Sequence, residues 1–398
     1  MTVDDADQAH LYMGRHQPQD YSGFEQGPIR PPSEARSLLI RVTRNCPWNK
    51  CTFCSVYKDE KFSLRPLDHI LKDIDSIHAV ITHIRSRLEK RAALSRAELD
   101  LEAGLHFGGE RQMFYAAVDW LVNGDGAVFL QDANSLIMKP DQLCTVLKYL
   151  RDRFPWVSRI TSYARSHTIN RMPPGALEQL AEAGLNRIHI GMESGSDRVL
   201  AAIKKGVTRQ GHIKAGLAVK KAGVELSEYI MPGLGGRELS QEHAVETASA
   251  LNLINPDFIR LRSLTLQPGS PLYAQYRAGA FRKNTEMETI IEIRTLVGNL
   301  EGINATLKSD HVYNLLQEIE GVLPGDKQKM LDTLDRFLAL DQDEQVLFQF
   351  GRRMGYFHVL DDLSSPARRS YVNQVGDKYQ ITPENIEHVL EAQTPNYI

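Results

Sequence analysis

Short apolar runs alternate along the chain with longer stretches in which apolar residues recur every three or four positions. The runs at 37–45 (SLLIRVTRN) and 126–136 (GAVFLQDANSL) predict a strand and a strand with its following loop. The stretches at 66–96 and 140–154 predict helices, and Pro140 with Asp141 marks the start of the second. This alternation of strands and helices predicts an α/β fold with a mostly parallel sheet.

The same alternation continues to about residue 273. Four more strands with their loops are predicted at 157–166, 186–197, 224–236 and 256–273, which makes six in all. Helices are predicted between them at 175–184, 208–223 and 240–254. Gly184 and Gly223 stand where helices commonly end in a left-handed residue.

From about residue 276 the strand signals stop, and four helices are predicted at 284–302, 311–323, 326–340 and 344–357. We therefore expect three parts: an extended N-terminal arm at 1–36, a β/α domain at 37–275, and a helical C-terminal region at 276–398 that covers it. Only about 36 residues precede the first strand, which is below the size of a domain.

Composition excludes several classes of protein. The 47 basic and 50 acidic residues give a net charge of -3, so no overall attraction to nucleic acid or membrane is expected. No run of about 18 apolar residues is present, and the polar N-terminus is unlike a signal peptide. Four cysteines in 398 residues are no disulfide framework. These features predict a cytoplasmic protein.

Three of the four cysteines lie close together directly after the first predicted strand, at Cys46, Cys51 and Cys54. A structural zinc site takes four ligands, usually as two pairs, and only one C-x2-C pair is present. An iron–sulfur cluster fits better, because three thiolates on a cubane leave one iron open to a non-protein ligand. Cys144 falls inside a predicted helix and is expected to be a buried structural thiol.

The cysteine segment resembles the radical S-adenosylmethionine (SAM) superfamily, whose signature is C-x3-C-x2-C with an aromatic residue before the last cysteine. Phe53 is that aromatic residue, and the spacing here, C-x4-C-x2-C, is one residue longer. The segments GMESGSDRVLAAIKKG (191–206), GLGG (233–236) and LQPGSPLY (266–273) resemble the branch with oxygen-independent coproporphyrinogen oxidases, elongator-type proteins and methylthiotransferases.

The resemblance implies a partial (β/α)6 TIM-like barrel over residues 37–275. It implies a 4Fe–4S cluster held by Cys46, Cys51 and Cys54, with SAM on the open iron. An electron from a donor such as flavodoxin or ferredoxin would cleave SAM to a 5′-deoxyadenosyl radical, which takes hydrogen from a substrate. Such chemistry is oxygen-sensitive.

The resemblance also implies which residues bind SAM, at the carboxyl ends of the strands. Two segments are candidates for the loop after the second strand: the literal GGE at 108–110, and QDAN, which strand placement favours. Glu193 is expected on the SAM ribose, with capping of the next helix as the alternative. The full cofactor-binding set is Gln131, Asp132, Ala133, Asn134, Tyr163, Arg165, Glu193, Gly233 and Arg262.

Polar residues in the C-terminal region are candidates for contact with substrate. Ser309, Asp310 and His311 are predicted to start a helix, where they serve either as caps or as substrate contacts and a proton donor. A small-molecule substrate is expected. The alternatives are a haem or metallocofactor carrier on the same fold, and an RNA-modifying enzyme, which the near-neutral charge disfavours.

Overall fold

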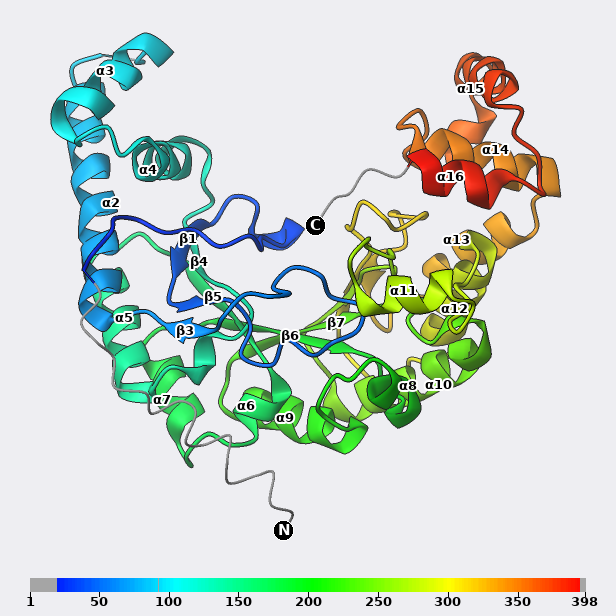
Figure 1. The fold of residues 1–398 in the computed structure, drawn as a ribbon, viewed down its shortest axis with the longest axis horizontal. Coiled ribbons are helices and arrows are strands. Elements are labelled where there is room, and N and C mark those ends of the chain that lie inside the picture. Colours follow the sequence, from blue (N-terminus) through cyan, green and yellow to red (C-terminus); the bar gives the residue numbers. More distant parts are fainter. Residues whose placement is uncertain (1–19, 92, 394–398) are drawn as a thin grey trace.

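The computed structural model describes residues 20–91 and 93–393 and is built around one eight-stranded sheet (Figure 1). The strand order is β1-β4-β5-β6-β7-β8-β9-β10; all pairs are parallel except β9–β10, which is antiparallel. The strands are β1 (Leu38–Arg41), β4 (Ala127–Gln131), β5 (Arg159–Ala164), β6 (Arg187–Glu193), β7 (Glu225–Ile230), β8 (Phe258–Leu261), β9 (Thr306–Lys308) and β10 (Gly321–Val322). Because β1 and β10 end the order without pairing, the sheet is a partial TIM-like barrel, as predicted.

Helices connect the parallel strands and cover the outside of the sheet (Figure 1). The first connections contain α2 (Leu67–Leu88), α3 (Arg96–His106), α4 (Arg111–Asn123), η2 (Ser135–Ile137), α5 (Pro140–Arg153), α6 (Ser166–Ile169) and α7 (Ala176–Glu182). The later ones contain α8 (Asp197–Ala202), α9 (Arg209–Lys221), α10 (Gly236–Ile254), α11 (Pro271–Arg277) and α12 (Glu286–Gly298). After β10 come α13 (Lys327–Leu338), α14 (Gln342–Arg353), η3 (Leu360–Ser364), α15 (Pro366–Tyr379) and α16 (Ile386–Gln393).

The apolar residues that predicted these elements form the core. All five residues of β4 are buried, as expected for a strand covered on both faces. On α2, Ile70, Ile74, Ile77 and Ile81 repeat at helical spacing and are at most 1% exposed. All six predicted strands are present. No helix in the described ranges is long and apolar enough to span a bilayer.

The C-terminal part differs from the prediction in two ways: it adds β9 and β10 to the sheet, and it lacks one of the predicted helices. No helix forms over 311–323, so that prediction is wrong: residues 309–320 are a looped connection between β9 and β10, and β10 follows at 321–322. Ser309 Oγ donates to Leu316 O, and Asn314 Nδ2 donates to Leu261 O, so side-chain hydrogen bonds hold the segment as a loop. Its apolar residues at helical spacing, such as Leu315 and Ile319, are buried individually from this loop.

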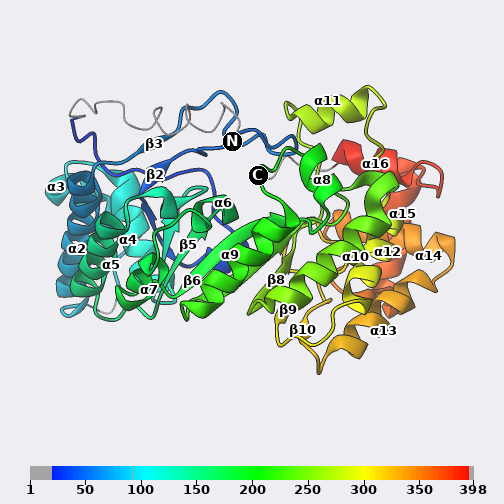
Figure 2. The same ribbon diagram turned by 90° about the horizontal axis from the view of Figure 1, so that it is seen from below.

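The helices α13–α16 lie at the β10 end of the sheet, on the opposite side of the molecule from α2–α5 (Figures 1 and 2). Arg353 at the end of α14 pairs with Glu286 and donates to Tyr313 O at 2.9 Å. The helical region thus contacts the segments that follow β8 and β9.

The expected N-terminal arm is described only from residue 20, since residues 1–19 lie outside the described ranges. Residues 20–31 are without helix or strand and run along the barrel. Tyr21 donates to Asp73 on α2, and Gly27 exchanges hydrogen bonds with the Gln131 side chain. The arm ends in η1 (Pro32–Glu34), whose buried Glu34 lies 3.1 Å from His189 Nε2.

Candidate active site

The cysteine loop, defined here as Asn45–Phe62, leaves the barrel after β1 and is closed at its base by two short strands. β2 (Thr43–Arg44) pairs antiparallel with β3 (Ser63–Leu64). Asn45 adopts a positive φ of 68°, which asparagine tolerates, and its Nδ2 donates to Lys61 O at 2.7 Å. The two ends of the loop are therefore held together.

Asp132, fully buried after β4, fixes this loop to the barrel. Its Oδ2 accepts hydrogen bonds from Arg41 Nε at 2.7 Å and from Asn45 N at 3.2 Å. Its Oδ1 accepts one from Tyr57 OH at 2.8 Å. The Asp132 carboxylate thus connects Arg41 at the end of β1 with two parts of the cysteine loop, its first residue Asn45 and Tyr57.

A second anchor comes from the segment between α8 and α9. Thr52 N donates to Ile203 O at 2.9 Å, and Trp48 Nε1 donates to Lys204 O at 2.8 Å. Gly206 packs so closely on the indole that a Cβ there would lie 2.4 Å from Trp48 Cζ2. Glycine is needed at 206 both for this contact and for its φ of 74°.

The three thiols Cys46, Cys51 and Cys54 all line one cavity at the carboxyl ends of the strands. Burial raises the pKa of Cys51 and of Cys54, and the neighbouring thiols raise them further. Among the described residues, these three sulfur atoms do not all lie within 4.8 Å of one another.

The cavity has an empty volume of about 1240 Å³, a value that includes space open to solvent. Its walls come from the cysteine loop, from the ends of β4 to β8 and from the β9–β10 connection. This is the end of a parallel barrel where active sites form. The lining residues used below are Cys46, Cys51, Phe53, Cys54, Ala133, Tyr163, Arg165, Glu193, Lys205, Tyr229, Arg262 and Tyr313.

Glu193 and Lys205 form an ion pair of 2.9 Å in the cavity wall, and both side chains are almost buried. Burial lowers the pKa of Lys205, but Glu193 and then the Cys51 thiol outweigh it, so the net shift is upward. Lys205 therefore stays charged beside the cysteines. Glu193 is not the cap of the next helix, because Ser196 Oγ accepts the Val199 N–H there.

The QDAN segment follows β4, as predicted, but it presents only Ala133 to the cavity. Gln131 holds the N-terminal arm through Gly27 and Ile29. Asn134 accepts from Arg165 N and donates to Thr168 Oγ1. Together with Asp132, these side chains are used within the protein, and so their predicted contact with SAM has no support in the geometry.

The alternative GGE segment lies between α3 and α4, in the first connection outside the sheet. Gly108 and Gly109 both have positive φ, of 61° and 76°, and make the turn between these helices. Neither they nor Glu110 line the cavity.

The remaining predicted SAM residues divide into two groups. Tyr163 and Arg165 line the cavity; Arg165 Nη2 donates to Lys205 O at 2.8 Å, and burial raises the pKa of Tyr163. Gly233, by contrast, lies in the turn before α10, where its N–H donates to Glu292 Oε1 at 2.7 Å, and it does not line the cavity.

The two arginines at the end of β8 take different positions. Arg260 pairs with Asp310 at 2.9 Å and donates to Ser227 Oγ. Arg262 lines the cavity, and within residues 20–91 and 93–393 its guanidinium has no ion-pair partner. Arg262 is thus available to an anionic ligand.

The predicted helix start at Ser309, Asp310 and His311 is absent, so none of these residues caps a helix there. None of them lines the cavity, which the neighbouring Tyr313 does. Burial lowers the pKa of His311 to about 3, with Arg262 and Arg353 adding to the effect. A neutral imidazole is a much weaker acid than imidazolium, so the structure gives no support to the predicted role of proton donor.

Sequence reasoning missed Lys205, Tyr229 and the anchoring role of Asp132. Lys205 stands next to Gly206 at the end of the segment GMESGSDRVLAAIKKG (191–206), which resembles the radical SAM family. Its place in this segment could have indicated a role in the site. Tyr229 follows from alternation on β7, because Ser227 on the same face contacts Arg260 inside the barrel. Nothing in the sequence indicates the partners of Asp132.

Comparisons with known proteins find one family model and several similar chains. Residues 134–248 match the family model described as the radical SAM superfamily. A tRNA uridine(34) acetyltransferase of Methanocaldococcus infernus is 22% identical over 280 residues, which cover 66% of this chain and 49% of that protein. A 4'-phospho-dehydrooxetanocin synthase of Priestia megaterium is 27% identical over 202 residues, covering 48% and 22% of the two chains.

Among solved structures, coproporphyrinogen III oxidase (HemN) from Escherichia coli is similar with a TM-score of 0.44 and 14% identity, over 67% of this chain and 54% of that one. The chain spans about half the length of the tRNA uridine(34) acetyltransferases that it matches. The match at residues 134–248 identifies a radical SAM domain in this part of the chain.

Proposed function

We propose that Cys46, Cys51 and Cys54 hold the 4Fe–4S cluster and that SAM binds beside it in the same cavity. The observation that carries this proposal is the position of all three thiols in the wall that also contains Glu193, Lys205 and Arg262. Three thiolates would hold three irons of a cubane cluster and leave the fourth iron for a ligand that is not part of the protein.

The polar groups of the cavity fit the parts of SAM. Lys205 and Arg262 are cations that would take its carboxylate, and Lys205 lies close enough to Cys51 to affect the pKa of that thiol. Glu193 would accept hydrogen bonds from the ribose hydroxyls. Ala133 would let SAM approach the main chain after β4, since its side chain is small.

When bound, the cluster supplies the electron that cleaves SAM to a 5′-deoxyadenosyl radical, which takes a hydrogen atom from the substrate. The chain's residues position the reactants and exclude water. Tyr163 and Tyr229 lie inside the barrel with their pKa values raised by burial, so both phenols stay protonated. They would therefore contact the substrate as neutral hydrogen-bonding groups.

The test is anaerobic reconstitution with iron and sulfide, followed by SAM and dithionite and chromatography for 5′-deoxyadenosine. The triple variant Cys46→Ala, Cys51→Ala, Cys54→Ala should bind no cluster and form no deoxyadenosine. Cys144→Ala is the matched control, because this thiol is on α5 and outside the cavity. Zinc in anaerobically purified protein, with no cluster on reconstitution, would refute the proposal. A cluster without SAM cleavage would favour the carrier function.

We propose a small molecule as the substrate, because the cavity lies within one barrel and the net charge is -3. RNA is a second candidate, since relatives at 21–22% identity are described as tRNA uridine(34) acetyltransferases. RNA binding that weakens as salt rises, measured by filter retention, would favour this candidate. Its absence would favour the small molecule.

The cellular setting is part of the proposal. A low-potential donor such as flavodoxin or ferredoxin would supply the electron. All four cysteines are free thiols, in keeping with a reducing cytoplasm. We also propose that residues 37–275 form the catalytic domain, with the arm at 1–36 and the region at 276–398 supporting it.

A further inference from the structure

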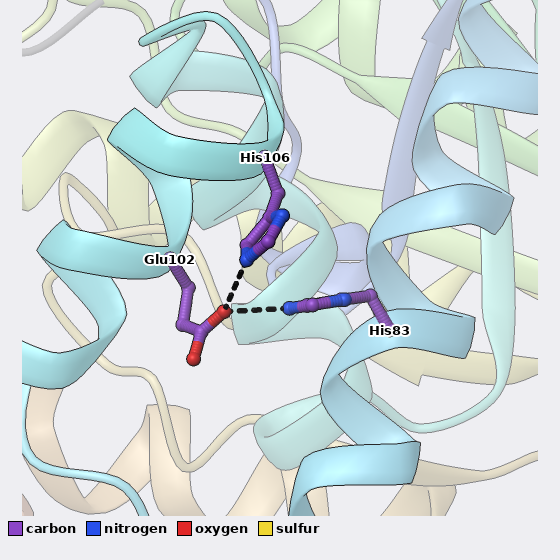
Figure 3. Close-up of side chains that lie close together, drawn as sticks. All are labelled: His83, Glu102 and His106. Carbon is purple, nitrogen blue, oxygen red and sulfur yellow. Dashed lines mark hydrogen bonds and ion pairs between the residues drawn. The ribbon is translucent and has the colours of Figure 1, made fainter.

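Outside the barrel, three side chains of metal-ligand type meet between α2 and α3. His83 comes from α2, and Glu102 and His106 come from α3; all three point toward one another (Figure 3). Glu102 Oε2 lies 2.7 Å from His83 Nε2 and 3.4 Å from His106 Nε2. The three atoms all lie within 4.8 Å of one another.

The helices hold these groups in place. A capping box of Ser95 and Glu98 fixes the start of α3. The spacing of four residues then puts Glu102 and His106 on one face of that helix. Arg87 on α2 donates from Nη2 to Glu102 Oε1 at 2.9 Å. The other carboxylate oxygen, Oε2, therefore faces the two imidazoles.

We propose that His83, Glu102 and His106 form a second metal site, which binds a divalent first-row transition ion such as Zn²⁺. Two imidazole nitrogens and one carboxylate oxygen are a known set for zinc with an open fourth position. Bonds of about 2.0–2.1 Å would place tetrahedral ligands about 3.3 Å apart, so side-chain adjustments of about 1 Å would complete the site. Imidazole ligands disfavour Mg²⁺ and Ca²⁺.

The cluster is exposed to solvent on one side, from which an ion and its water could enter. His106 is 51% exposed in its side chain, whereas Glu102 is 8% exposed, so the site is open on one side and closed on the other. The Phe107 ring packs on the His83 ring at 5.5 Å and restrains it. The Arg87 contact orients the carboxylate, as the outer partners of metal ligands commonly do. A bound ion would connect α2 to α3.

The test uses the full chain with its reconstituted cluster, Zn²⁺ titration against a chromophoric chelator, and metal analysis. Wild type should bind one zinc per chain with the iron content unchanged. His83→Gln and His106→Gln should each weaken binding at least about tenfold. His388→Gln on α16 is the control and should bind as wild type does.

X-ray absorption at the zinc edge identifies the ligands independently. Nitrogen and oxygen neighbours without sulfur would support the site. Sulfur neighbours, or zinc binding within about twofold of wild type in both histidine variants, would overturn it. Folding of the variants is checked by their cluster content, which the proposal expects to be unchanged because the site lies outside the cavity.

Discussion

Removing the Asp132 carboxylate should loosen the cysteine loop and lower both the stability and the iron content of the protein. Asp132→Ala leaves Arg41, Tyr57 and the Asn45 N–H without their acceptor in a fully buried place. Breaking one partner of a buried charged network costs about 3–5 kcal/mol. Asp132→Asn keeps the shape but loses the charge, and we expect it to cost about 2 kcal/mol.

The assay is urea denaturation of the apoprotein, combined with iron analysis after reconstitution. Asp152→Asn is the matched control: Asp152 is an exposed carboxylate on α5, and its change should stay within about 0.5 kcal/mol. Tyr57→Phe removes a single hydrogen bond and should cost about 1–2 kcal/mol, which keeps the test usable if Asp132→Ala does not fold. A loss under about 1 kcal/mol for Asp132→Ala, with wild-type iron content, would refute the reasoning.

Three further predictions concern Lys205 in the cavity wall, Gly206 beside the cysteine loop, and the buried His311. Lys205→Met should weaken SAM binding at least about tenfold in equilibrium dialysis, because the nearly buried Glu193 carboxylate loses its ion-pair partner. Lys204→Met, at an exposed position, is the control and should leave SAM binding unchanged. Gly206→Ala should lower the amount of cluster retained on gel filtration, because the added methyl group collides with the Trp48 indole of the cysteine loop. Gly223→Ala is the control, since Gly223 has a similar φ of 73° but open space around it. Equal cluster retention in the two variants would contradict the prediction. The pKa of His311 is about 3 in the folded protein and lies below the ordinary value of 6.5. As the pH drops from about 6.5 to about 3, the unfolded chain therefore binds a proton at His311 that the folded protein does not. The free energy of unfolding falls over this range. His311→Gln should reduce this fall in denaturation curves at successive pH values, and an unchanged slope would count against a buried neutral imidazole.

Much of the fold follows from local pattern, whereas the site depends on contacts between distant segments. The six strands were predictable because each is a short apolar run in a regular β/α order. β9 was missed because it has three residues and gives no period to detect. The loop at 311–323 was predicted as a helix because Leu315 and Ile319 have helical spacing, although hydrogen bonds to Leu261 and Leu316 decide its conformation.

Within the site, the place of the three cysteines at the barrel mouth was predictable from their position after the first strand, whereas the surrounding side chains were not. Gln131, Asp132 and Asn134 stand at the right strand end, but long-range partners turn them away from the cavity. Lys205 lies twelve residues after Glu193, and the chain brings the two side chains together because it turns back toward the barrel after α8. Such pairings depend on tertiary structure, and no single-residue preference reveals them.

The longer spacing between the first two cysteines has a consequence for how related sequences diverge. Asn49, between them, has a φ of 47° and its N–H lies 3.4 Å from Cys46 Sγ, so the chain turns back on itself there. A left-handed turn takes up an additional residue without lengthening the path between the flanking thiols. We therefore expect one additional residue at this point to fit where asparagine, aspartate or glycine occupies the turn. Searches for distant members that fix the number of intervening residues would overlook such chains, whereas a pattern that allows one extra residue with a turn-forming side chain would find them.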